Sequence, residues 1–332
     1  MRYVFGFLGV FTLSLMLSVG CSETSGTGGS GGDGGTGGMT GQEFPCTEQG
    51  IRDAIAEGGG PHTFDCDGPT TVVVEAFIAI DNDVILDGEG NLTVDGNSAS
   101  DLLVVQDEVT AELSGFTVTR GGNQPCDETN DTCAGIWNSG TLLLTNVTLT
   151  ENGWGAANAG TLTMINTTVS ENDTDGIANL GTLALTNSTV SGNARAAIAN
   201  GRGTAVLTAC TVSGAIENSS EGTLTFAGSL VAGNCGGEIT SDGYNIESPG
   251  DTCGFDQTGD QPGVSAEQLN LGPLAANGGP TMTHKPGDGG FGTDSAAIDQ
   301  IPAVDCEVDE DQRGEPRPGG PACDVGAVEV QP

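Results

Sequence analysis

Residues 134–158 read AGIWNSGTLLLTNVTLTENGWGAAN, and the chain repeats this pattern four more times before residue 236. Each copy contains a Gly-Thr pair, and the pairs begin at Gly140, Gly160, Gly181, Gly203 and Gly222. Successive copies are therefore 20, 21, 22 and 19 residues apart. Repeats this short and this regular are typical of solenoid proteins.

Three apolar positions recur in every copy, one before the Gly-Thr pair and two after it. They are Ile136, Ala156, Ile177, Ile198 and Ile216, then Leu144, Met164, Leu185, Leu207 and Phe226, then Leu149, Val169, Val190, Val212 and Val231. Thr and Ser alternate with them, which is the two-residue period of β-strands. Three short strands in about 20 residues leave no room for a crossover helix, so they can bury their apolar sides only by coiling around a common axis. The pattern predicts an all-β, single-stranded parallel β-helix.

Asparagine recurs in two further columns of the alignment. The first holds Asn138, Asn158, Asn179, Asn200 and Asn218, and the second holds Asn146, Asn166 and Asn187. We expect both columns to form stacked amide ladders, about 4.8 Å apart, at tight corners where Asn tolerates left-handed backbone geometry.

The first 42 residues indicate an export signal followed by a tether. Residues 1–20 combine Arg2 with an apolar run too short to span a membrane, which is typical of a signal peptide. Small residues directly before Cys21 resemble a bacterial lipobox, so we expect Cys21 to carry a lipid that anchors the protein in the outer membrane, exposed at the cell surface. Ordinary secretion is the alternative. Residues 21–42 are mostly Gly, Ser and Thr, which predicts a flexible tether.

The composition is strongly acidic, with 45 Asp and Glu against 8 Lys and Arg and a formal net charge of −37. Such a surface repels nucleic acid, anionic lipid headgroups and polyuronates, and it attracts divalent cations. We therefore expect no nucleic-acid partner, and we expect the protein to be a monomer.

The 10 cysteines of an exported chain predict disulfides. Proximity in sequence suggests pairs, although it does not fix the connectivity. The suggested pairs are Cys46 with Cys66, Cys126 with Cys133, Cys235 with Cys253, and Cys306 with Cys323. Cys210 is left over and shares its column with Val147, Thr167, Ser188 and Ser229. It is therefore predicted to be a buried free thiol.

Sequence signals also delimit the solenoid. Thr47 can cap a short helix with Ile51 and Ile55 on one face, so residues 43–62 are predicted to form a helical cap over the first coil. Strand-like runs continue through residues 63–247, about eight or nine coils. An insertion at residues 121–132 predicts a corner loop.

Residues 248–332 are rich in Gly, Pro and Asp and contain four blocks that do not repeat. The blocks are 271–284 (LGPLAANGGPTMTH), 295–299 (SAAID), 311–317 (DQRGEPR) and 323–329 (CDVGAVE). In this order they resemble the C-terminal region of the choice-of-anchor Q family of bacterial surface proteins, and the preceding repeats are similar to that family as well. The resemblance implies a right-handed β-helix of the pectin-lyase type with a loop-rich C-terminal cap. It brings no catalytic residues to this chain.

An enzymatic function must be weighed because lyases and glycosidases share the β-helix. Glu151 and Glu171 share a column on adjacent coils, so they could lie about 5 Å apart, as a retaining glycosidase requires. An exposed ion-pair stack with Arg120, or a weak calcium site, explains the same pair. We therefore predict no catalytic residues.

No cofactor is predicted, and calcium binding is the one alternative that the sequence leaves open. Its candidate ligands are Asp127, Glu128 and Asp131, Asp81 and Asp83, Glu307, Asp309 and Asp311, and residues 289–296. Calcium-binding nonapeptides act as stacked copies, and residues 289–296 stand alone, so no metal site is assigned.

Trp137 and Trp154 flank the first repeat and are the only tryptophans, which suggests a small sugar-stacking patch. The expected function is that of a non-catalytic surface lipoprotein whose β-helix presents a binding or structural face, for adhesion or cell-envelope contact. The alternative is a carbohydrate-active enzyme, a glycoside hydrolase or polysaccharide lyase, acting on a neutral glycan. Carboxylates clustered in a groove with aromatic side chains would favour the enzyme, and uniform Thr, Ser and Asn faces would favour the surface protein.

Overall fold

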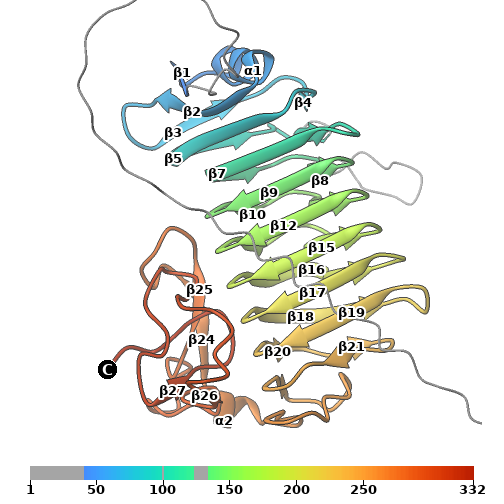
Figure 1. Ribbon diagram of the computed structural model, residues 1–332, viewed down its shortest axis with the longest axis vertical. Coiled ribbons are helices and arrows are strands. Elements are labelled where there is room, and N and C mark those ends of the chain that lie inside the picture. The colour runs from blue at the N-terminus through green and yellow to red at the C-terminus, as the bar shows by residue number, and fades with distance from the viewer. Residues whose placement is uncertain (1–40, 99–100, 123–133) are drawn as a thin grey trace, which may run out of the picture. The chain divides into compact units, whose positions relative to one another are not determined.

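The computed structural model describes residues 41–98, 101–122 and 134–332, which form a right-handed parallel β-helix of about nine turns with very few helices. Each full coil contributes strands to three sheet faces, as the green and yellow coils of Figure 1 show. All strand pairings between coils are parallel, so the predicted solenoid is confirmed.

The three faces are numbered in the order in which a coil visits them. Face 1 contains β2 (Gly59–Asp65), the first part of β5 (Val84–Asp95) and of β7 (Thr110–Thr119), β9 (Thr141–Thr145), β12 (Thr161–Ile165), β15 (Thr182–Thr186), β17 (Thr204–Thr208), β19 (Thr223–Ala227) and β22 (Thr240–Ser241). Face 2 contains β3 (Thr70–Val73), the second part of β5 and of β7, β10 (Thr148–Thr150), β13 (Thr168–Ser170), the first part of β16 (Thr189–Asn200) and of β18 (Thr211–Asn218), β20 (Leu230–Ala232) and β23 (Ile246–Ser248). Face 3 contains β4 (Ile78–Ile80), β6 (Leu103–Val105), β8 (Ala134–Asn138), β11 (Trp154–Asn158), β14 (Ile177–Asn179), the second part of β16 and of β18, and β21 (Cys235–Gly236).

The core is the space inside the coils, and the predicted apolar columns fill it. Ala156 pairs with Ile177, and Ile177 pairs with Ile198, so each column runs straight through successive coils. All members of the three columns are at most 1% exposed. Because the strands alternate, the Thr and Ser residues between them point outward or into corners. Burial of these aliphatic stacks is the main source of stability.

Both predicted asparagine columns were expected to form stacked amide ladders at tight corners, and each column fulfils one of these two roles. In the first column each amide donates to the next, with Nδ2 to Oδ1 distances of 2.8 Å from Asn138 through to Asn218. The second column takes left-handed geometry instead, with φ between 47° and 56° at Asn146, Asn166 and Asn187. The first column is therefore the ladder, and the second column forms the corners.

A third asparagine column was not predicted from the sequence. Asn152 Nδ2 donates to Asn172 Oδ1 at 3.1 Å, and Asn172 Nδ2 donates to Asn193 Oδ1 at 2.8 Å. These residues hold the corner between faces 2 and 3. Their repeat spacing is as regular as that of the other two columns, so the same alignment could have revealed them.

The N-terminal cap forms as the sequence indicates. Helix α1 (Glu48–Glu57) begins after Thr47, whose side chain accepts a hydrogen bond from the Gly50 amide, and Ile51 and Ile55 are buried. Strand β1 (Glu43–Pro45) pairs with β2, which begins at Gly59, so solenoid strands start slightly before residue 63.

Residues 263–332, called the C-terminal segment below, contain α2 (Ala266–Leu269), β24 (Leu271–Ala275), β25 (Thr283–Pro286), β26 (Ile301–Pro302) and β27 (Ala322–Cys323). The segment packs along face 2, as Figure 1 shows in orange and red. Gln312 Nε2 donates to Thr168 Oγ1 at 2.9 Å, and the Ala327 amide donates to Thr211 Oγ1 at 3.0 Å. The C-terminal segment does not close the last coil. Phe255, which precedes the segment, closes it by packing on Phe226.

Disulfides join Cys46 to Cys66, Cys235 to Cys253, and Cys306 to Cys323, as sequence proximity suggested. The suggested pair of Cys126 and Cys133 lies outside the described residues, as do the predicted signal peptide, Cys21 and almost all of the predicted tether. Within the described ranges, neither helix has the length and apolar character needed to cross a membrane.

Candidate functional site

A groove on face 3 has a volume of about 540 Å³ and is lined by both tryptophans. Its floor is an outward-facing column in which Ala157, Ala178 and Ala199 occupy paired positions on β11, β14 and β16. Trp137 precedes this column in the register, and Glu217 follows it. Alanine places nothing beyond Cβ over the strands, and the floor is therefore shallow and smooth.

The tryptophans stand at one end of the groove. Trp137 lies in the floor column, and its indole Nε1 donates to Ser139 Oγ at 3.1 Å, which fixes the ring. Trp154 pairs with Ala134 at the start of β11, on the side of the floor that faces the corner between faces 2 and 3. Both rings are partly buried, so each keeps an accessible surface. The predicted sugar-stacking residues thus share one groove.

An arginine held between two carboxylates lies beside the floor, on the coils that carry Ala178, Ala199 and Glu217. Arg195 Nη1 lies 3.4 Å from Asp175 Oδ2, and Arg195 Nη2 lies 3.5 Å from Glu217 Oε2. The Asp175 side chain is 4% exposed and the Glu217 side chain 55% exposed. Burial raises the pKa of Asp175, with a further rise from the charge of Glu217, although a hydrogen bond from the Ala196 amide and the charge of Arg195 act in the opposite direction. Burial therefore favours the protonated form of Asp175.

The acidic pair singled out from the sequence lies elsewhere. Thr150 pairs with Ser170, so Glu151 and Glu171 do occupy one column, and both have left-handed geometry at the corner between faces 2 and 3. Neither lines the groove. Arg120, in the same column, forms its ion pair with Asp95, which is the largest cause of the raised pKa of Arg120. Glu217 lines the groove, and the buried Asp175 pairs with the groove residue Arg195; sequence reasoning missed both acids.

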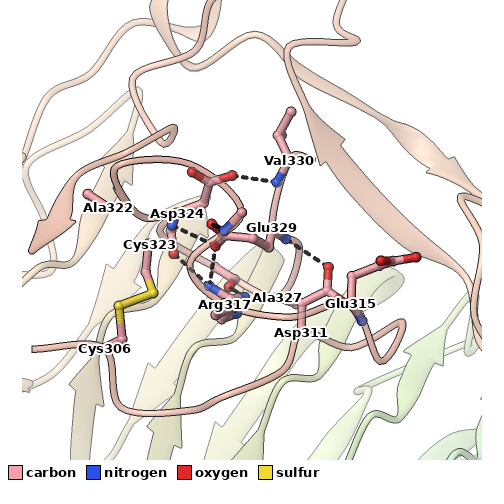
Figure 2. Close-up of polar contacts among 12 residues, drawn as sticks. Cys306, Asp311, Glu315, Arg317, Ala322, Cys323, Asp324, Ala327, Glu329 and Val330 are labelled. Carbon is pink, nitrogen blue, oxygen red and sulfur yellow. Dashed lines mark hydrogen bonds and ion pairs between the residues drawn. A yellow bond between two sulfur atoms is a disulfide. The ribbon is translucent and has the colours of Figure 1, made fainter. Parts of the chain in front are cut away.

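A second polar cluster, in the C-terminal segment, is fully enclosed. Figure 2 shows Arg317 between Glu329 and the backbone of Asp324, with Nη1 to Oε2 of Glu329 at 3.3 Å and Nη1 to the Asp324 carbonyl at 2.8 Å. Asp311 accepts from Arg313 and from the Glu329 amide, both at 2.8 Å. Arg317 and Glu329 are almost completely buried, and no substrate reaches them.

This cluster explains two of the sequence blocks. Residues 311–317 and 323–329 supply its acids and arginines, so the blocks keep the C-terminal segment folded. Burial raises the pKa of Asp324 to about 6, against hydrogen bonds from the Val330 and Asp299 amides. Burial likewise lowers the pKa of Arg317, which the charge of Glu329 opposes.

Two further reactive side chains are also enclosed. Cys210 is a buried free cysteine, as predicted, and burial raises the pKa of its thiol to about 12. His284 Nε2 lies 2.7 Å from Ser191 Oγ, and His284 Nδ1 lies 2.7 Å from the Gly272 carbonyl. Nδ1 therefore carries the proton, and Ser191 donates to Nε2. Both residues are buried, and burial lowers the pKa of His284, so this pair fastens the C-terminal segment to face 2.

The calcium candidates do not come together. Among residues 41–98, 101–122 and 134–332, no group of three or more His, Cys, Asp or Glu side chains could hold a metal ion. Asp311 is engaged by Arg313, and Asp83 accepts a hydrogen bond from the Thr110 amide at 2.7 Å. Asp127, Glu128 and Asp131 fall outside the described residues.

Comparison with known proteins supports the fold alone. No protein-family model matches the sequence, and no curated protein matches it. Among solved structures, the chain is similar to the crystal structure of pectate lyase Pel9A, with a TM-score of 0.54 and 13% sequence identity. The match covers 87% of this chain and 96% of that chain.

Proposed function

We propose that this protein is a glycan-binding protein of the bacterial cell surface, and that the groove on face 3 is its binding site. The observation that carries the proposal is the meeting of Trp137 and Trp154 in one groove. Tryptophan offers a flat apolar ring and an N–H group, which suits the apolar face and the hydroxyl rim of a sugar. Such a site needs no metal or cofactor.

The charge of the groove selects a neutral ligand. The charged side chains that line it, Arg195 and Glu217, balance each other, and the whole chain has a net charge of −37. A polyuronate is repelled by this field. The similarity to a pectate lyase therefore does not extend to a proposal of pectate as ligand.

Binding is tested with a glycan array probed with the purified chain that begins at residue 22. Trp137→Ala and Trp154→Ala are expected to weaken binding about fivefold each, since one aromatic contact contributes about 1 kcal/mol. Phe291→Ala is the matched control, because Phe291 is 61% exposed and lies outside the groove. Unchanged binding in both tryptophan variants would remove the groove from consideration.

Hydrolysis of a neutral glycan is the second candidate function, favoured by the two acids that pair with Arg195. A glycosidase needs one carboxyl that gives a proton and one carboxylate that activates water or attacks the sugar. The raised pKa of Asp175 suits the donor, and the exposed Glu217 suits the second role. Hydrolysis is supported if the wild type releases reducing ends from neutral polysaccharides and the variants Asp175→Asn and Glu217→Gln do not. If the wild type releases no more than Glu217→Gln, the protein binds without hydrolysis.

We also infer that lipid on Cys21 attaches the protein to the outer membrane through the tether of residues 21–42. The lipobox-like sequence before Cys21 supports this anchor. Cells that express the protein should incorporate labelled palmitate into it, and Cys21→Ala should release it from the membrane fraction. A Cys21→Ala variant that stays in the membrane fraction would contradict the anchor.

A further inference from the structure

The floor of the groove repeats with the coils. Its positions on six successive strands of face 3 pair with one another, and they are Trp137, Ala157, Ala178, Ala199, Glu217 and Gly236. Neighbouring strands lie about 4.8 Å apart, so the five steps give a floor about 24 Å long that runs along the stacking direction. An occupant lying on this floor meets the same small side chain, alanine, on the three coils between Trp137 and Glu217.

We infer that the occupant is an extended, uncharged chain of β-1,4-linked hexopyranose rings, with one ring on each coil. The inference rests on the proposed glycan-binding function and specifies its ligand. Successive rings of an extended β-1,4-linked chain follow one another at nearly the spacing of adjacent strands. An α-1,4-linked chain curls, so its rings leave a straight floor after a few units.

The cross-section of the groove suits a flat ring. The middle of the floor has only the methyl groups of Ala157, Ala178 and Ala199, so a pyranose ring can lie on it without displacing a side chain. Leu180, which is 51% exposed, stands beside the floor as an apolar wall. Trp137 and Trp154 hold the ring at one end, and Glu217 can accept hydroxyl hydrogen bonds at the other.

The first test is chain length and linkage, measured by calorimetry on the wild type. Cellohexaose, mannohexaose and chitohexaose are the β-1,4-linked probes, and maltohexaose is the α-1,4-linked control. At least one β-1,4-linked series should bind more tightly as it lengthens from disaccharide to hexasaccharide, by about tenfold or more overall, and then level off because the floor has six positions. Maltohexaose should bind no better than maltose.

The second test blocks the middle of the floor. Ala178→Leu should reduce the affinity for the hexasaccharide to that of the disaccharide, and it should leave disaccharide binding at the tryptophan end intact. Ala184→Leu is the matched control, because Ala184 points outward from the same coil on face 1. This control should keep the full dependence on chain length.

The outcomes separate the two claims. If no glycan binds on the array, the proposed function and this inference both fail. If glycans bind but none of the three β-1,4-linked series does, or if affinity is independent of length, or if maltohexaose binds as tightly, the inference alone is overturned. Retention of the length dependence in Ala178→Leu would also overturn it.

Discussion

Thr161 and Thr168 belong to the same coil, and their side chains have different surroundings. Thr161 is exposed on face 1, whereas Thr168 is buried on face 2 under the C-terminal segment and accepts a hydrogen bond from Gln312. Both are favourable in a strand because threonine is β-branched. At the residue scale, the repeat therefore fixes the inward side of each strand, and the outward side depends on what covers it.

Cys210 should be unreactive in the folded protein. Its thiol is fully buried, and burial raises its pKa to about 12, so almost no thiolate is present at neutral pH. Treatment with a thiol-specific reagent, followed by peptide mass spectrometry, should find Cys210 modified only after denaturation. Cys210→Ser should cost at most about 1 kcal/mol because serine occupies this column in the neighbouring coils. Rapid modification of the native protein would contradict the burial.

Asp324 should make the wild type less stable as the pH rises. The unfolded carboxyl has a pKa of 3.8 and the folded one about 6, so the folded state binds the proton more tightly. This contribution is present in full below pH 3.8 and is lost as the pH rises through about 6, and it amounts to about 3 kcal/mol. Urea unfolding between about pH 4 and pH 7.5 should show the wild type losing stability relative to Asp324→Asn. Asp251→Asn, at an exposed position, should show no such change relative to the wild type.

The element that unites the coils is the ladder from Asn138 to Asn218. Each inner amide receives one hydrogen bond and donates another to its neighbour, so the members depend on one another. The amides also donate to backbone carbonyls, for example Asn179 to Gly181. A continuous ladder fixes the register of face 3 and therefore the straightness of the groove floor.

Removing an asparagine from the middle of the ladder should lower the free energy of unfolding more than removing one from its end. Asn179→Ala removes two ladder hydrogen bonds, the one from Asn158 and the one to Asn200 Oδ1, and should lower the free energy of unfolding by about 3 kcal/mol. Asn218→Ala removes one ladder partner, so its cost should be clearly smaller. The shift in urea midpoint measures both variants. Equal shifts would show that the ladder bonds contribute independently of position.

The sequence was sufficient to predict the coils. It was insufficient to predict the charged residues beside the groove floor. Register is carried by columns such as Ile177 and Ile198, so the fold and the shared position of Trp137 and Trp154 near the first repeat could be predicted. Arg195 could not be placed, because the pairing of β16 with β18 shifts register between Ser191 and Ala196. An alignment on Gly-Thr pairs does not detect that shift. The ion pairs of Arg195 with Asp175 and Glu217 therefore became visible only in the structure.

The packing of residues 263–332 on face 2 was also beyond prediction. Gln312 contacts residues about 30 to 145 positions away, and the block that contains it has no repeat to align. A resemblance to other surface proteins indicated a cap over the solenoid. The structure places much of that region along its side.

At the scale of the whole molecule, the exposed edge of the first coil is the main hazard for a chain of this kind. Unpaired strand edges template association, and α1 covers the first coil with Ile51 and Ile55. The net charge of −37 adds repulsion between copies, which weakens as salt screens it.

Loss of the helical cap should therefore produce self-association that increases with salt. Ile51→Asp places a charge in the buried contact of α1 and should loosen the helix from the first coil. Size-exclusion chromatography should show oligomers that increase at high ionic strength. Gln49→Asp adds the same charge at an exposed position of α1 and should remain monomeric. A monomeric Ile51→Asp variant at all salt concentrations would mean that the first coil needs no cover.

The hydrogen bonds between the C-terminal segment and face 2 also bear on the order in which the chain acquires its structure. Contacts within the solenoid join residues about 20 apart, whereas Thr168 meets Met282 across 114 residues and Gln312 reaches Thr167 across 145. A polypeptide that is synthesised from its N-terminus can stack its coils as they appear, and only the last residues to arrive can complete face 2. The segment can therefore dock only on coils that have already stacked in register, because its hydrogen-bond partners come from several different coils.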